Sequence, residues 1–144
     1  NGRQDGLFPE KNDGERRKSV VSFTNDRMAI YSYSRQQAID DGVLVDITEM
    51  AQEAGFRFPV AVTRTVWETI TPSPTDITQS ISGRVWDMLW MLRLAAKGGK
   101  GKSEILFSFV VNDDGSERTV ELKAICHPGD MMEPVITIMA PYED

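Results

Sequence analysis

Two groups of residues in this sequence have types and spacing that could support chemistry, and the first is an acid pair. Asp40 and Asp41 close a predicted short helix, where carboxylates face the negative end of the helix dipole. Together with Tyr33 and Arg35 they predict a polar recognition patch, to which Asp46 would add a carboxylate. A residue that breaks a local folding rule can mark function. Solvated charges at a helix end are the blander interpretation, and we prefer it.

The second group is Cys126 and His127, the only cysteine and the only histidine of the chain. Neighbours on a strand point to opposite faces, so these two do not form a nucleophile–base pair. His127 could act as a lone general base oriented by Asp130 or Glu133, but we prefer the interpretation as a turn histidine without a catalytic role. Neither group has the ligand spacing of a metal site, and we expect no metal and no cofactor.

A third motif, residues 96–103 (AKGGKGKS), differs by one residue from the phosphate-binding pattern GxxxxGK[ST]. A P-loop follows a strand and opens a helix, whereas here a helix precedes the motif and a strand follows it. We therefore interpret it as a helix C-terminus whose lysines complement the dipole. A looser anion contact from Lys97, Lys100 and Lys102 is the alternative.

Two short capped helices around a small apolar strand must position the acid pair. Ser34 followed by Gln37 fits a capping box, and Gly42 can then take the left-handed conformation that ends the first helix. Thr48 opens the second helix and Gly55 closes it in the same way.

A long helix is predicted from Asp76 or Ser80 to about Lys97. Its apolar residues cover nearly the whole circumference, which is typical of a helix buried in the middle of a domain. We therefore expect Trp86 and Trp90 to pack in the core. A role in stacking on a ligand or anchoring a partner is the alternative.

The last third of the chain alternates apolar and polar residues, as strands do. Strands are predicted at 105–111, 120–126 and 134–139, the first two joined by a turn at Asn112-Asp-Asp-Gly-Ser. The expected fold is α+β, with short helices and one long central helix packed on a C-terminal three- to four-stranded antiparallel sheet. Either the segment 43–47 or a second subunit would complete that sheet.

Composition limits the domain organisation and the partners. With 144 residues, 40% of them hydrophobic, the chain fits one domain. We expect a mobile, polar tail at 1–19 and a single α+β domain at 20–144. The net charge of -6 disfavours binding to nucleic acid or to anionic membranes. A single cysteine cannot form an internal disulfide, which suits a reducing compartment.

Three segments carry a resemblance to a known family: YSYSRQQAIDDGVLVDIT at 31–48, GRVWDMLWMLR at 83–93 and EPVITIM at 133–139. The sequence resembles an uncharacterised family of short bacterial proteins that are often encoded on plasmids, phages and other mobile elements. That family has no established activity, so the resemblance implies no catalytic residues. It implies a cytoplasmic bacterial accessory protein.

Two functions of different classes follow from the sequence. The first is a non-enzymatic protein-binding module with an acidic, aromatic-edged surface. The second is a small-molecule or nucleotide-binding domain, with a hydrolase as its enzymatic version. Its site would use five side chains, namely Tyr33, Arg35, Asp40, Asp41 and His127. The second requires these side chains to lie close together, because acid–base partners must nearly touch. The oligomeric state stays open.

Overall fold

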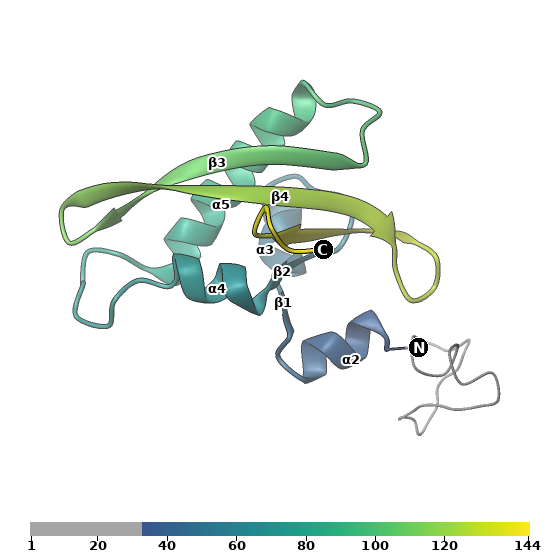
Figure 1. The fold of residues 1–144 in the computed structure, drawn as a ribbon, viewed down its shortest axis with the longest axis horizontal. Helices are drawn as coiled ribbons and strands as arrows, with labels where there is room; N and C mark the ends of the chain where they lie inside the picture. The colour runs from purple at the N-terminus through teal and green to yellow at the C-terminus, as the bar shows by residue number, and fades with distance from the viewer. Residues whose placement is uncertain (1–32) are drawn as a thin grey trace.

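The computed structural model describes residues 33–144, which form helices and one sheet (Figure 1). The expected α+β class is confirmed. The predicted tail at 1–19 lies outside the described residues, as does the part of the predicted domain that precedes Tyr33. None of the helices between residues 33 and 144 combines the length and hydrophobicity that crossing a bilayer requires.

Helix α2 (Arg35–Asp40) begins at the predicted capping box. The Ser34 hydroxyl accepts a hydrogen bond from the Gln37 backbone N–H at 3.0 Å, and the Gln37 side chain accepts one from the Ser34 N–H at 2.8 Å. Gly42 follows with φ of +78°, the left-handed conformation predicted for it. Local side-chain chemistry therefore fixes both ends of this six-residue helix.

Helix α3 (Thr48–Glu53) begins where predicted, but a different side chain caps it. The N-cap residue is Ile47, which has no side-chain cap, and the Asp46 carboxylate accepts from the Thr48 N–H at 3.0 Å. Thr48 lies inside the helix, so its hydroxyl bonds Asp46 instead of the helix backbone. Gly55 has φ of +100° just after the helix, as expected.

Strands β1 (Leu44–Asp46) and β2 (Val60–Thr63) pair antiparallel and flank α3 in sequence. Helix α4 (Arg64–Ile70) follows β2 directly, with the Thr63 hydroxyl as its cap. Three consecutive β2 residues, Val60 to Val62, are fully buried. A strand buried on both faces shows no alternation in its sequence, which is why β2 was not predicted.

Helix α5 (Ile81–Lys97) begins at the Ser80 cap and ends where predicted. One face is buried, with Val85, Met88, Leu89 and Leu92 in contact with the core. The prediction that both tryptophans pack in the core is wrong, because Trp86 is 44% and Trp90 is 55% exposed. The sheet covers only one face of α5, and the tryptophans lie on the other.

Strands β3 (Glu104–Asp113) and β4 (Ser116–Pro128) form the predicted hairpin. Asp114 and Gly115 connect them, and both have positive φ, at +51° and +90°. Two central residues of this kind make a type I′ turn, whose twist matches that of the flanking strands.

Strand β5 (Pro134–Met139) has the predicted bounds and lies in the middle of the sheet. The order is β1-β2-β5-β4-β3. β5 is antiparallel to β4 and parallel to β2, so within residues 33–144 the sheet has five strands and one parallel pair instead of three or four antiparallel strands. The difference arises because β1 and β2 join the sheet through β5.

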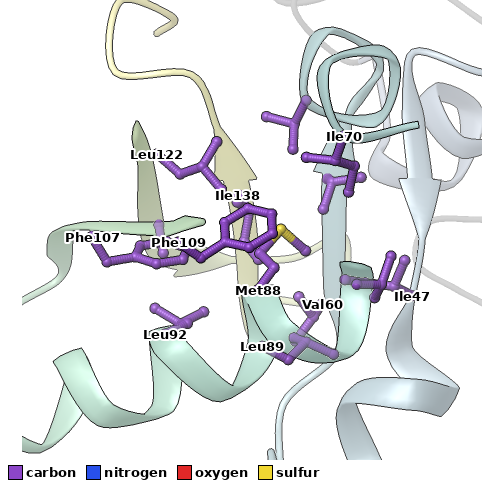
Figure 2. Close-up of a cluster of buried hydrophobic side chains, with 14 of the residues drawn as sticks. Ile47, Val60, Ile70, Met88, Leu89, Leu92, Phe107, Phe109, Leu122 and Ile138 are labelled. Carbon is purple, nitrogen blue, oxygen red and sulfur yellow. The ribbon is translucent and has the colours of Figure 1, made fainter. Parts of the chain in front are cut away.

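The core lies between the sheet and the helices α3, α4 and α5 (Figure 2). Met88 of α5 lies beside Ile138 of β5 and Phe109 of β3 there, and Leu89 of α5 lies beside Val60 of β2. Thr137 alternates with Ile138 along β5 and therefore faces the other side of the sheet. Helix α2 bonds to Thr137, so α2 lies on that opposite side.

Candidate functional site

Arg35 and His127 meet at one hydroxyl group, although they are far apart in sequence. Arg35 is the first residue of α2, His127 lies near the end of β4, and Thr137 lies on β5 between them. Arg35 Nη1 donates to Thr137 Oγ1 at 2.8 Å, and His127 Nε2 lies 2.7 Å from the same oxygen. We call these three residues the Thr137 cluster.

The hydrogen-bond partners assign the proton positions in the Thr137 cluster. His127 Nδ1 lies 3.1 Å from the Pro128 carbonyl oxygen, which can only accept, so Nδ1 carries a proton. With neutral His127, Nε2 then accepts the proton of the Thr137 hydroxyl. The Thr137 oxygen in turn accepts from Arg35. In this tautomer the guanidinium donates to the hydroxyl, and the hydroxyl donates to the imidazole.

The Arg35 guanidinium is partly withdrawn from water. Burial lowers its pKa from the usual value, while the negative charges of Asp46, Asp130 and Glu133 act in the opposite direction. Its second terminal nitrogen donates to the Ile136 carbonyl at 2.8 Å. Both terminal nitrogens of Arg35 therefore donate hydrogen bonds to residues of β5.

Asp130 holds the N-terminus of α2 against the loop between β4 and β5. Its carboxylate accepts from the backbone N–H of Arg35 at 2.8 Å and of Gln36 at 3.1 Å. A carboxylate at this end of a helix compensates the dipole and satisfies free donors. Asp130 thus positions Arg35, a different role from orienting His127.

Tyr33, Asp40 and Asp41 form a second group. The Tyr33 hydroxyl donates to Asp41 Oδ2 at 2.6 Å, and this hydrogen bond raises the pKa of Tyr33. Asp40 accepts from the Gln36 side chain at 3.0 Å, one helical turn away. No hydrogen bond or ion pair among residues 33–144 joins Asp40 or Asp41 to the Thr137 cluster. The five predicted site residues therefore fall into two groups.

The Thr137 cluster has the geometry of a nucleophile and its base, but its oxygen is buried. A hydroxyl within hydrogen-bonding distance of an imidazole nitrogen is the arrangement of an activated nucleophile. Thr137 is only 6% exposed, and its oxygen is already bonded to both neighbours. The hydrogen bonds of this arrangement therefore attach α2 to the sheet.

The other predicted motifs lie as follows. Residues 96–103 include the last two residues of α5 and the loop that leads to β3, so the motif ends a helix and precedes a strand, the reverse of a P-loop. Cys126 is a half-buried free cysteine and pairs with Ile136 across β4 and β5. Within the described range, no three His, Cys, Asp or Glu side chains gather as metal ligands.

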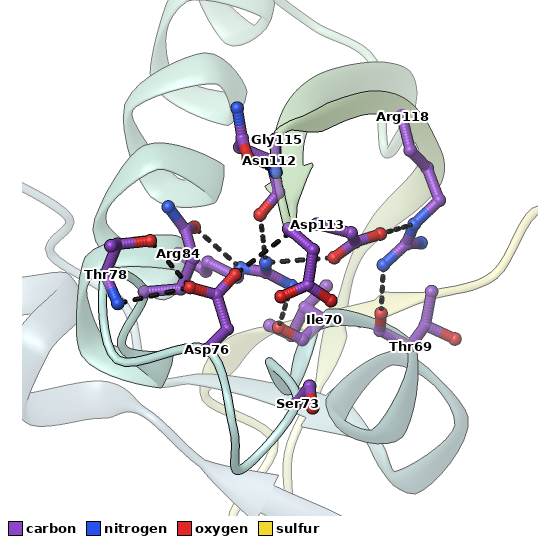
Figure 3. A network of polar contacts seen from close by, with 12 residues as sticks. Thr69, Ile70, Ser73, Asp76, Thr78, Arg84, Asn112, Asp113, Gly115 and Arg118 are labelled. Atoms are coloured by element: carbon purple, nitrogen blue, oxygen red, sulfur yellow. Dashed lines mark hydrogen bonds and ion pairs between the residues drawn. The ribbon is translucent and has the colours of Figure 1, made fainter.

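Arg84 of α5 is the centre of a polar network that the sequence did not reveal (Figure 3). It is only 3% exposed, and its guanidinium donates to the carbonyls of Ile70 at 3.2 Å and Asn112 at 2.7 Å. It also pairs with Asp113 at 3.0 Å. The sequence contains a signal for this burial, because Arg84 lies four residues before Met88 and therefore on the same face of the helix as the apolar core residues.

The outer face of α5 carries the other feature with functional potential. Trp86, Trp90 and Leu94 are spaced four residues apart, so they form one stripe, and all three are exposed. The Arg93 guanidinium lies 5.8 Å from the Trp90 ring centre, within range of a cation–π contact. We call Trp86, Trp90 and Leu94 the α5 stripe.

The comparisons with known proteins give a family and no function. A family model described as a family of unknown function (DUF6573) matches residues 21–144, beginning before the resemblance seen from Tyr31 onward. No curated protein and no solved structure matches the chain.

Proposed function

This chain belongs to the DUF6573 family, whose function is unknown, and we propose that it is a non-enzymatic module that binds a protein partner. The observation that carries the proposal is the α5 stripe. Trp86 and Trp90 expose about half of their surface side by side on a rigid helix. Tryptophan is enriched among the residues that dominate binding energy in protein interfaces.

Charge around the α5 stripe indicates the chemistry of the partner. Arg93 lies beside Trp90, and Lys97 is exposed on the same side of the helix one turn further. The stripe therefore fits an amphipathic segment with aliphatic side chains flanked by Asp or Glu. The net charge of -6 disfavours a nucleic acid as the polyanion that binds there.

The cellular setting belongs to the same proposal. The family resemblance described above supports a bacterial accessory protein encoded on a mobile element, acting in the cytoplasm. The free Cys126 is compatible with a reducing compartment.

A synthetic peptide tests the α5 stripe. The probe is a labelled amphipathic helix with leucines on one face and glutamates beside them, and its charge-reversed twin carries lysines. We expect fluorescence polarisation to show salt-sensitive binding of the glutamate peptide and at least about tenfold weaker binding of the lysine peptide. Replacing both Trp86 and Trp90 by Ala should weaken binding by at least about tenfold.

The matched control replaces two exposed apolar residues outside the stripe, Ile77→Ala and Met132→Ala, and should leave binding unchanged. Equal binding of the two peptides would contradict the proposed partner chemistry. Binding that survives the loss of both tryptophans would contradict the proposed surface.

The second candidate is a small-molecule or nucleotide-handling domain, with a hydrolase as its enzymatic form. The shared hydroxyl of the Thr137 cluster supports it, and the burial of Thr137 ranks it second. The measurement is the Tm with and without a nucleotide such as ATP. A rise in Tm that His127→Gln and Arg35→Lys abolish, and that Asp87→Asn preserves, would favour this candidate.

A further inference from the structure

β3 is the outermost strand of the sheet in the part of the chain that the structure describes, and it is long. It has ten residues, whereas β1 at the opposite edge has three. An edge strand presents unpaired N–H and C=O groups that can pair with another strand. Proteins usually shorten such edges or protect them with lysine, proline or a bulge.

β3 lacks these protections. From Ile105 to Val111 it contains six apolar residues and one serine, without a charged residue, proline or glycine. Leu106 and Val110 are 67% and 53% exposed on the face opposite the core. A segment of this composition at an open edge pairs readily with another strand.

We propose that the edge of β3 pairs antiparallel with β3 of a second copy of this chain, in a register that places Ser108 opposite its own counterpart. The result is a dimer with twofold symmetry and one continuous ten-stranded sheet. This inference goes beyond the proposed function and does not depend on it, because it uses a different surface.

The register follows from self-complementarity. With Ser108 at the centre, Leu106 faces Val110 of the second copy and Ile105 faces Val111, and all of these residues lie within β3. Each contact occurs twice because the interface is symmetric. Apolar pairs directly across a strand pair are stabilising.

The neighbouring registers fit less well. A shift of two residues in one direction places Leu106 opposite Asn112 and Ser108 opposite Val110. A shift in the other direction places Glu104 opposite Val110 and Leu106 opposite Ser108. Both shifts remove the apolar pairs on the exposed face, and the register centred on Ser108 keeps them.

The core side of the sheet also suits an added strand. In the proposed register Phe107 faces Phe109 of the second copy on that side. Figure 1 shows α5 crossing β3 and continuing past its edge, and Met91 in this half of α5 is exposed. Helix surface is therefore available beside the inner face of the added strand.

Two double variants of the full 144-residue chain test the proposal. Leu106→Lys with Val110→Lys places lysine opposite lysine in the dimer, whereas Leu106→Lys with Val110→Glu places lysine opposite glutamate. Sedimentation velocity over a range of concentrations should find a wild-type dimer. The Lys/Glu variant should dimerise at least about tenfold more tightly than the Lys/Lys variant.

Thermal unfolding of both variants confirms that each is folded, and only folded variants are compared. A monomeric wild type at all concentrations would overturn the proposal, as would equal dimerisation of the two variants. Tighter dimerisation of the Lys/Lys variant would overturn the register. In the shifted register Glu104 lies opposite position 110, where lysine is more favourable than glutamate. A monomer whose β3 amides resist hydrogen exchange would show that the chain covers its own edge.

Discussion

Asp113 shows how one carboxylate can tie a turn to a helix. It lies at the end of β3 and accepts from Arg118 Nε at 2.6 Å and from Arg84 Nη2 at 3.0 Å. The hydrogen bond from Arg118 lowers the pKa of Asp113, and that from Arg84 acts in the same direction. The folded protein therefore holds this group ionised to a lower pH than the unfolded chain does.

A pH-dependent contribution to stability follows from Asp113. Its stabilisation is fully present above the ordinary pKa of an aspartate, about 4, and is lost as the pH falls through the lower folded pKa. We expect Asp113→Asn to unfold at lower urea concentration near pH 7 and to lose less stability on acidification than the wild type. Urea titrations between about pH 7 and pH 2.5 measure both effects.

The matched control is Asp87→Asn, which removes an exposed acid of α5 outside the Arg84 network. It should keep the pH dependence of the wild type. If Asp113→Asn kept that dependence as well, Asp113 would not be coupled to folding through its charge.

At the scale of elements, α5 is organised by a buried arginine as well as by its apolar face. Arg84 donates to the last residue of α4, Ile70, and to Asn112 in β3, so one side chain joins three elements (Figure 3). Apolar burial alone does not fix the position of α5 along the sheet, because the hydrophobic effect is not directional. The hydrogen bonds of the Arg84 guanidinium are directional, so they set this position.

We expect Arg84→Met to lower the free energy of unfolding by about 3 kcal/mol, because buried carbonyls then lose their donors. Arg84→Lys keeps the charge but cannot reproduce the planar set of donors, so its free energy of unfolding should lie between those of the wild type and Arg84→Met. Urea denaturation with near-UV circular dichroism measures the loss. A change below about 1 kcal/mol for Arg84→Met would mean that water replaces the guanidinium.

Helix α2 contrasts with α5, because polar contacts hold it in place. Its only buried residue is Ala38, while Arg35 and the Asp130 carboxylate attach it to β5 and to the loop before β5. Helices held mainly in this way open at lower free energy than helices with an apolar face. The Thr137 cluster is thus a polar attachment of a marginal helix.

At the scale of the whole molecule, the sequence predicts features with local causes. The capping box at Ser34, the left-handed Gly42 and the type I′ turn at Gly115 each depend on residues a few positions apart. The bounds of β5 and the end of α5 were equally readable from proline, glycine and periodicity. The α+β class follows from these elements.

What the sequence could not predict depends on long-range pairing. Arg35 and His127 converge only because α2 docks beside the β4–β5 pair, and no local pattern encodes that meeting. β2 lacks alternation, so its parallel pairing with β5 was hidden. The exposure of Trp90 was missed because an apolar helix circumference does not tell which face the sheet covers.

The central place of β5 has a consequence for synthesis. β5 is the last of the five strands to leave the ribosome, yet it joins β1–β2 on one side to β3–β4 on the other. Until residues 134–139 emerge, the nascent chain carries two separate strand pairs with extra open edges. The two strand pairs therefore cannot join before β5 has emerged, and we expect a product truncated before Pro134 to be a substrate for chaperones and proteases.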